Sequence, residues 1–197
     1  NNHGNHYDES IGDLWRSHRS YHEACRYYER AAYRARQHGQ LQKAWPLFRK
    51  LLKTLPSDCM AQRIQYSLDG AAIAFRLGHI DEAFRLCRLS SHHALKLSAY
   101  NQAARAHVLI ASMLIEIGSV RHVLRYTARA NSLLNCEGDV WTRCHLYNVL
   151  ARRALMMGQH KDALKWHLKA LEGAQKLHLS PNERLLLEWT DAEIEAN

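Results

Sequence analysis

Cysteine and histidine offer the most obvious chemistry in this chain, as metal ligands or as redox groups. The 197 residues include 14 histidines and five cysteines, and the cysteines form no Cys-x-x-Cys pair. The nearest approaches to a site are Cys136 with Cys144 and His145, and the adjacent pair His92 and His93. Neither group has the short, converging spacing that a tetrahedral zinc site requires. We therefore predict no metal and no cofactor. An odd number of scattered cysteines also favours a reducing compartment over a disulfide framework.

Sequence motifs for catalysis are also lacking. The chain contains no Gly-x-Ser-x-Gly elbow, no P-loop and no Gly-x-Gly-x-x-Gly fingerprint, and no pair of carboxylates stands on an expected inward face. The five tryptophans are better explained as packing anchors than as a cofactor site. We predict that the chain is not an enzyme and has no catalytic residues.

The elements that must position any site are expected to be helices. The composition is 47% hydrophobic with only three prolines and nine glycines, which excludes a disordered or low-complexity chain. Apolar residues recur three and four positions apart rather than in alternation, which is typical of amphipathic helices. The most apolar stretch, 106–117, contains His107, Ser112 and Glu116 and is too short and too polar to span a membrane. We predict an all-α protein.

An internal repeat organises these helices. Four glycines 39 or 40 residues apart are each preceded seven residues earlier by an alanine and followed five residues later by a small apolar residue. A large apolar residue follows three positions further on. The glycines are Gly39, Gly78, Gly118 and Gly158; the preceding alanines are Ala32, Ala71, Ala111 and Ala151; the small residues that follow are Ala44, Ala83, Val123 and Ala163. Four matches at one period indicate an array of repeats.

Each column of the repeat has a physical role. A glycine adopts the left-handed conformation at a helix end without a steric penalty, so it should end a first helix, A. The alanine two turns earlier allows a second helix, B, to approach closely, and the small residue after the glycine would face it. One such hairpin cannot bury its own apolar face and must stack on its neighbours.

This arrangement resembles the tetratricopeptide repeat. Ala32, Gly39, Ala44, Phe48 and Pro56 stand at the family's small residue, turn glycine, helix B alanine, aromatic and closing proline. Later repeats keep the small residues and the glycine but replace the aromatic. The period of about 40 is similar to that of LGN-type adaptors, kinesin light chain and bacterial tetratricopeptide regulators. The resemblance implies an all-α, right-handed superhelical solenoid of helix-turn-helix repeats.

The repeat register gives the expected boundaries. Residues 1–24 would be a tail and a capping helix over 8–18, and 182–197 would form a C-terminal capping helix. Residues 25–181 would hold four repeats, at about 25–63, 64–103, 104–143 and 144–181. Helices A are expected at about 25–38, 64–77, 104–117 and 144–157, and helices B at about 40–54, 80–95, 120–134 and 160–177. Pro46 inside a helix B should cause a kink or a late start.

The resemblance also implies a concave groove lined by helices A. The positions it assigns to a partner-binding groove are Arg26, Tyr33, Arg36, Gln65, Phe75, Arg76, Arg105, Ile115, His145, Asn148 and Arg152. Arginine can bind carboxylates in bidentate fashion, and the apolar positions would receive apolar side chains. We therefore expect a non-catalytic, cytoplasmic scaffold for protein–protein interaction, with the nucleus as an alternative location. Its partner would present an extended acidic or amphipathic peptide.

Two alternatives remain open. The chain has 27 Lys and Arg against 19 Asp and Glu, and Arg121, Arg125 and Arg129 recur every four residues on a helix B. Such a stripe on the outer face would suit RNA or DNA, although no nucleic-acid motif accompanies it. The chain would also suit a regulatory or sensor domain of a larger transcription regulator. No membrane insertion is expected.

Overall fold

The computed structural model describes residues 3–136 and 138–175, with side chains from residue 7 onward apart from that of Cys136. These residues form nine α-helices and no strand. The helices are α1 (His3–Ser17), α2 (Tyr21–Gln37), α3 (Leu41–Thr54), α4 (Met60–Arg76), α5 (Ile80–Lys96), α6 (Tyr100–Glu116), α7 (Val120–Cys136), α8 (Val140–Met156) and α9 (His160–Ala174). None of the described helices is long and apolar enough to cross a lipid bilayer.

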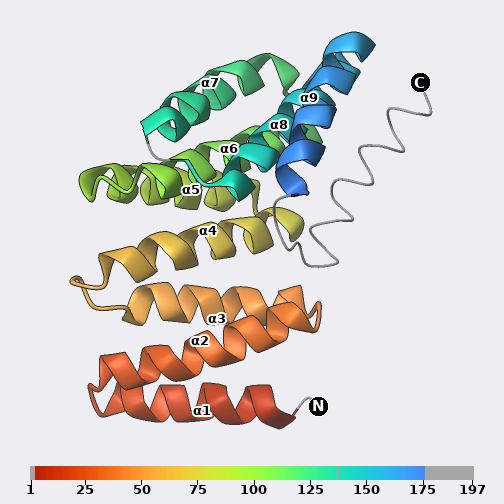
Figure 1. The fold of residues 1–197 in the computed structure, drawn as a ribbon. Coiled ribbons are helices and arrows are strands. Elements are labelled where there is room, and N and C mark those ends of the chain that lie inside the picture. The colour runs from red at the N-terminus through yellow and green to blue at the C-terminus, as the bar shows by residue number, and fades with distance from the viewer. Residues whose placement is uncertain (1–2, 137, 176–197) are drawn as a thin grey trace. The chain divides into compact units, whose positions relative to one another are not determined.

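The chain divides into two compact units, residues 1–93 and 94–197, and the boundary falls within α5. In unit 1, α1 packs on α2, α2 on α3 and α3 on α4 (Figure 1). The hydroxyl of Ser90 donates to the carbonyl oxygen of Ile64 at 3.2 Å and joins α5 to α4. In unit 2, α6 packs on α7 and on α8, and α8 also packs on α7 and α9. Within each unit, neighbouring helices thus stack as in helical repeats, and the predicted all-α, solenoid-type fold class is confirmed.

The small residues of the repeat lie in the interior of this packing. Ala32, Ala71, Ala111 and Ala151 are fully buried, and so are the small residues of helix B, Ala44, Ala83, Val123 and Ala163. A larger side chain at any of these positions would push a pair of helices apart. The burial of all eight agrees with the interior positions that the repeat pattern predicts for them.

Six of the connections share one backbone turn. A residue with φ between 55° and 82° follows the helix and donates its N–H three residues back, and the next residue donates five residues back. At Gly118 these two bonds reach Ile115 and Leu114 at 3.0 and 2.8 Å. This is the Schellman motif, which satisfies the last carbonyls of a helix. The left-handed residues are Arg19, Gly39, Gly78, Ser98, Gly118 and Gly158.

The ends of α3 and α7 are capped in another way, by an arginine from the next helix. Arg63, the fourth residue of α4, donates to the carbonyl oxygens of Leu52 and Leu55 at 3.1 and 2.7 Å. Arg143, the fourth residue of α8, donates to the carbonyl oxygen of Leu134 at 3.0 Å. Both arginines bind free carbonyls at a helix C-terminus, where the helix dipole also favours a cation.

Some helix boundaries differ from the prediction. Helices A begin at residues 21, 60, 100 and 140, four residues earlier than expected. The reason for the first and third is the left-handed turn at Arg19 and Ser98, which ends one helix and opens the next within three residues. Pro46 does not delay α3, which begins at Leu41; the proline is the sixth residue of the helix and is exposed. The capping helix expected over 8–18 extends back to His3, and the one expected over 182–197 lies outside the described residues.

Candidate functional site

The predicted groove positions divide between the two units. Six of them lie on α2 and α4 and define the A-helix face of unit 1: Arg26, Tyr33, Arg36, Gln65, Phe75 and Arg76. The other five lie on α6 and α8 and define the A-helix face of unit 2: Arg105, Ile115, His145, Asn148 and Arg152. Each face is described by itself.

Three positions on the A-helix face of unit 1 converge on one buried carboxylate. Asp69 of α4 is only 5% exposed and accepts three side-chain hydrogen bonds. They come from the hydroxyl of Tyr33 at 2.5 Å, a guanidinium nitrogen of Arg36 at 2.8 Å and the amide of Gln65 at 2.8 Å. A buried carboxylate is stable only when it is neutralised and its lone pairs are satisfied. The network meets both needs. The primary role of these three side chains is therefore to stabilise the fold, not to bind a ligand.

Tyr33 and Arg36 differ in how available the network leaves them to a ligand. Burial, together with the hydrogen bond to Asp69, raises the pKa of Tyr33 far above its ordinary value, so the phenol stays protonated as a donor. Its ring also packs edge-on against Phe48, with centroids 5.5 Å apart. The side chain of Arg36 remains 42% exposed. Arg36 can therefore offer its outward N–H groups to a ligand, but its charge is already balanced by Asp69.

The other members of this face are more loosely held. Arg26 is exposed and pairs with Glu23 one turn earlier at 3.2 Å, an arrangement worth little free energy in water. Phe75 is half-buried, and Arg76 is exposed. Arg76 forms no hydrogen bond or ion pair with any residue that the structure describes. It is the cation of this face that a ligand could reach at least cost.

On the A-helix face of unit 2, three side chains form a stack. The guanidinium carbon of Arg105 on α6 lies 5.0 Å from the ring centre of Trp141 on α8. The Trp141 ring in turn stacks on His145, with centroids 4.5 Å apart and planes 15° from parallel. All three side chains are half-buried. Cation–π contact orients the arginine without neutralising its charge.

Asp139, a carboxylate on which the charge of Arg105 acts, is engaged elsewhere. Asp139 is the N-cap of α8, and its two oxygens accept from the backbone N–H and the hydroxyl of Thr142 at 2.7 and 2.8 Å. Burial raises the pKa of Asp139, but the hydrogen bonds from Thr142, then the interaction with Asn101 and last the charge of Arg105 outweigh it and leave the pKa below its ordinary value. Arg105 forms no ion pair within the described ranges 3–136 and 138–175. The stack thus presents a charged, oriented and unpaired guanidinium.

The remaining positions of the unit 2 face differ in exposure. Ile115 is 3% exposed and belongs to the core, so it presents no surface to a ligand. Asn148 and Arg152 are half-buried and already take part in interactions within the protein.

Two residues of these faces were missed by sequence reasoning. Asp69 follows Gln65 by four residues and so lies on the same side of α4, which is a usable signal for a shared network. Trp141 precedes His145 by four residues on α8, where ring stacking is likewise favoured by the helix. Among the side chains that the structure describes, no three His, Cys, Asp or Glu residues are placed to hold a metal ion. The side chain of Cys136, part of one group considered above, lies outside that description.

No protein-family model and no curated protein matches the chain. The chain is similar to the crystal structure of BtubC (BKLC) from P. vanneervenii, with a TM-score of 0.69 and 16% sequence identity. The alignment covers 99% of this chain and 79% of that chain. At this identity the similarity shows the fold alone, and the fold it shows is an array of helical repeats.

Proposed function

We propose that this chain is a tetratricopeptide-repeat-like scaffold without catalytic activity, and that it binds an extended acidic or amphipathic peptide of a partner protein. The observation that carries the proposal is the stack of Arg105, Trp141 and His145 in unit 2. Arginine and tryptophan are the residues most enriched among those that dominate binding energy at protein interfaces. An arginine oriented by an aromatic ring loses little further entropy when it binds a carboxylate.

The stack would recognise both parts of an amphipathic peptide. A carboxylate of the peptide would accept hydrogen bonds from the unpaired guanidinium of Arg105, while an apolar side chain would pack against the exposed parts of the Trp141 and His145 rings. Unit 1 by itself offers Arg76, an exposed cation without an ion pair among the described residues, for a separate contact with a carboxylate. Arg36 would contribute less than the sequence suggested, because Asp69 already balances its charge.

The proposal includes a cytoplasmic location, with the nucleus as the alternative. Cys25, Cys59, Cys87 and Cys144 are free thiols, which supports a reducing compartment.

Peptide titration tests the proposal. The full chain would be titrated with a short peptide of alternating Glu and Leu residues, and with the matched peptide in which Lys replaces Glu. We expect saturable quenching of tryptophan fluorescence by the acidic peptide only. Reversing the charge with Arg105→Glu should weaken binding by about tenfold or more, because a hydrogen-bonded charge contact becomes a repulsion.

Arg125→Glu is the matched control, since Arg125 is exposed on α7 and the substitution changes the net charge by the same amount. If both substitutions weaken binding equally, general electrostatic attraction explains the result and the stack is not the site. If the acidic peptide does not bind while an RNA or DNA oligonucleotide binds in a manner that depends on Arg121, Arg125 and Arg129, the basic stripe is the functional surface instead.

A further inference from the structure

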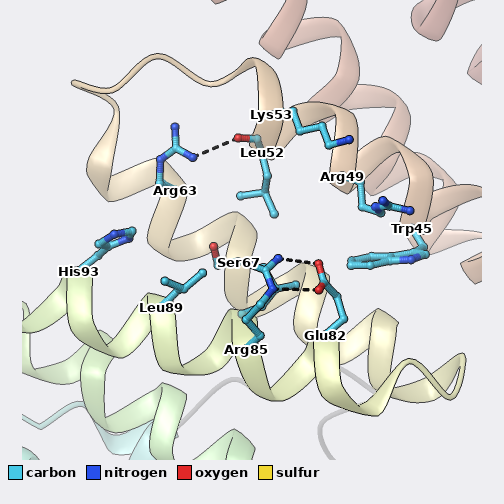
Figure 2. A pocket seen from close by; sticks show the side chains of 11 residues that line it. Trp45, Arg49, Leu52, Lys53, Arg63, Ser67, Glu82, Arg85, Leu89 and His93 are labelled. Atoms are coloured by element: carbon cyan, nitrogen blue, oxygen red, sulfur yellow. Dashed lines mark hydrogen bonds and ion pairs between the residues drawn. The ribbon is translucent and has the colours of Figure 1, made fainter.

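Unit 1 contains a cavity that shares no residue with its A-helix face. The cavity has a volume of about 310 Å³ and lies among α3, α4 and α5 (Figure 2). This is at the lower end of the range for small-molecule sites, about 300–1,000 Å³. Four cationic side chains line it, Arg49, Lys53, Arg63 and Arg85, against one carboxylate.

Two of these four cations already bind other groups of the protein. Arg63 donates to the carbonyl oxygens at the end of α3, as described above. Arg85 donates through two nitrogens to the carboxylate of Glu82, at 2.6 and 2.9 Å (Figure 2). These hydrogen bonds, followed by the charge of Arg85, lower the pKa of Glu82, so the carboxylate stays ionised and cancels that arginine.

Among the described residues, Arg49 and Lys53 form no ion pair, although the charge of Arg49 also helps to lower the pKa of Glu82. They stand four residues apart on α3, so they lie one above the other on the same side of the helix. Both are exposed, and neither forms a hydrogen bond or an ion pair with any residue in the described part of the chain. Arg49 is oriented by Trp45, with its guanidinium carbon 5.9 Å from the ring centre. Two adjacent cations without a counter-ion repel each other unless an anion lies between them.

A hydroxyl in the cavity wall suits the same kind of ligand. Ser67 of α4 lines the cavity, and its hydroxyl forms no hydrogen bond with any residue that the structure describes. In Figure 2, Ser67 lies on α4 between the side chains that come from α3 and those that come from α5. The hydroxyl oxygen keeps some exposed surface, so a ligand oxygen in the cavity can accept its hydrogen bond.

Apart from His93, the rest of the cavity wall is apolar. Leu52 reaches in from α3, Leu86 and Leu89 come from α5, and Trp45 closes one side. An inorganic anion would leave these surfaces uncovered, whereas a ligand with a ring-sized apolar body would bury them.

We propose that this cavity binds an aryl phosphate, a phosphate monoester carried on an aromatic ring. The phosphate has a charge of about −2 at neutral pH, which suits the two cations that form no ion pair with the described residues, and its oxygens can accept from Arg49, Lys53 and Ser67. The ring lies against the leucines and Trp45. The site is separate from the peptide-binding stack of unit 2 and does not depend on it. The ring and phosphate can belong to a free small molecule or to a phosphotyrosine side chain of a partner.

Amide chemical shifts of the full chain in solution test this site. Phenyl phosphate should cause saturable shifts in α3, α4 and α5, while phenol and inorganic phosphate, each lacking half of the ligand, should bind at least about tenfold more weakly. Arg49→Gln and Lys53→Gln should each lower the affinity for phenyl phosphate by about tenfold, and Ser67→Ala should also lower it. Arg88→Gln is the matched control, because Arg88 is exposed on α5 but does not line the cavity.

The outcomes are distinct. If phenyl phosphate causes no saturable shift, if inorganic phosphate binds as tightly, or if Arg88→Gln weakens binding as much as Arg49→Gln, the proposal is wrong. A capped tripeptide with a central phosphotyrosine distinguishes the two sources. Binding as tight as that of phenyl phosphate indicates a protein-borne ligand, and binding of phenyl phosphate alone indicates a small molecule. Neither result depends on Arg105, so this proposal and the peptide-binding proposal can fail independently.

Discussion

Substitutions at two equivalent turns of unit 2, Gly118→Ser and Ser98→Gly, should change its stability in opposite directions. Gly118 follows α6 with φ 74°, and Ser98 follows α5 with φ 55°. Both turns form the same pair of backbone hydrogen bonds, with N···O distances of 3.0 and 2.8 Å at Gly118 and 3.1 and 2.8 Å at Ser98. The two sites therefore differ mainly in whether the left-handed residue carries a Cβ.

The structure sets the expected magnitudes. A Cβ built on Gly118 meets no atom within 4 Å, so Gly118→Ser adds no clash and its cost is conformational alone. A residue with a Cβ in the left-handed region costs about 1–2 kcal/mol. Ser98→Gly removes a strain of that size, but glycine also increases the entropy of the unfolded chain by about 0.5–1 kcal/mol. We therefore expect Gly118→Ser to destabilise the protein by about 1 kcal/mol and Ser98→Gly to stabilise it by about 0.5 kcal/mol.

Urea unfolding followed by helical circular dichroism measures both changes. The midpoint should fall for Gly118→Ser and rise for Ser98→Gly, with the same slope, because neither substitution changes the surface exposed on unfolding. The double variant should show the sum of the two effects, since the residues share no partner. The reasoning is refuted if both single variants shift the midpoint in the same direction, or if Gly118→Ser has the wild-type midpoint. In either case residues 98 and 118 would not be the left-handed residues that end α5 and α6.

Two further predictions concern buried titratable groups. Asp69→Asn should destabilise unit 1 by about 2–4 kcal/mol, because one amide oxygen cannot replace a carboxylate that accepts from Tyr33, Arg36 and Gln65; urea unfolding measures the loss, and a wild-type midpoint would contradict the network. Burial, followed by the charge of Arg129, lowers the pKa of His107 from 6.5 to about 4. Because the unfolded chain takes up this proton first, unit 2 should keep its full stability above pH 6.5 and lose about 1–2 kcal/mol as the pH falls towards 4, after allowance for solvent screening. His107→Gln should flatten this part of the pH dependence, and an unchanged pH profile would contradict it.

The local features of the fold were readable in the sequence. The glycine after each helix A and the alanine two turns before it predicted the helical hairpins, their order and the residues at which the two helices meet. These signals act within one or two helical turns, where helix geometry alone decides which residues share a face. The earlier starts of α2 and α6 were missed because Arg19 and Ser98 occupy left-handed positions where glycine is the usual signal.

The contacts of the groove residues could not be predicted from local sequence patterns. The repeat register placed Tyr33, Arg36 and Gln65 on neighbouring helices, but it could not show that all three bind Asp69. Two of those hydrogen bonds join residues 36 and 33 positions apart in the chain. The same holds for Arg105 on Trp141. Which arginine keeps a free charge depends on which carboxylate or ring the packing of two helices brings within a few ångströms of it.

The sequence by itself determined that this chain forms an array of helical hairpins, and which small residues lie at each joint. Only the tertiary structure decided which of its many cations are neutralised and which stay available to a ligand. Arg36, Arg63 and Arg85 are committed to a carboxylate or to backbone carbonyls, whereas Arg49, Lys53 and Arg105 are not. The physical reason is that a repeat pattern sets backbone geometry through local interactions, while charge compensation requires contact between side chains from different helices.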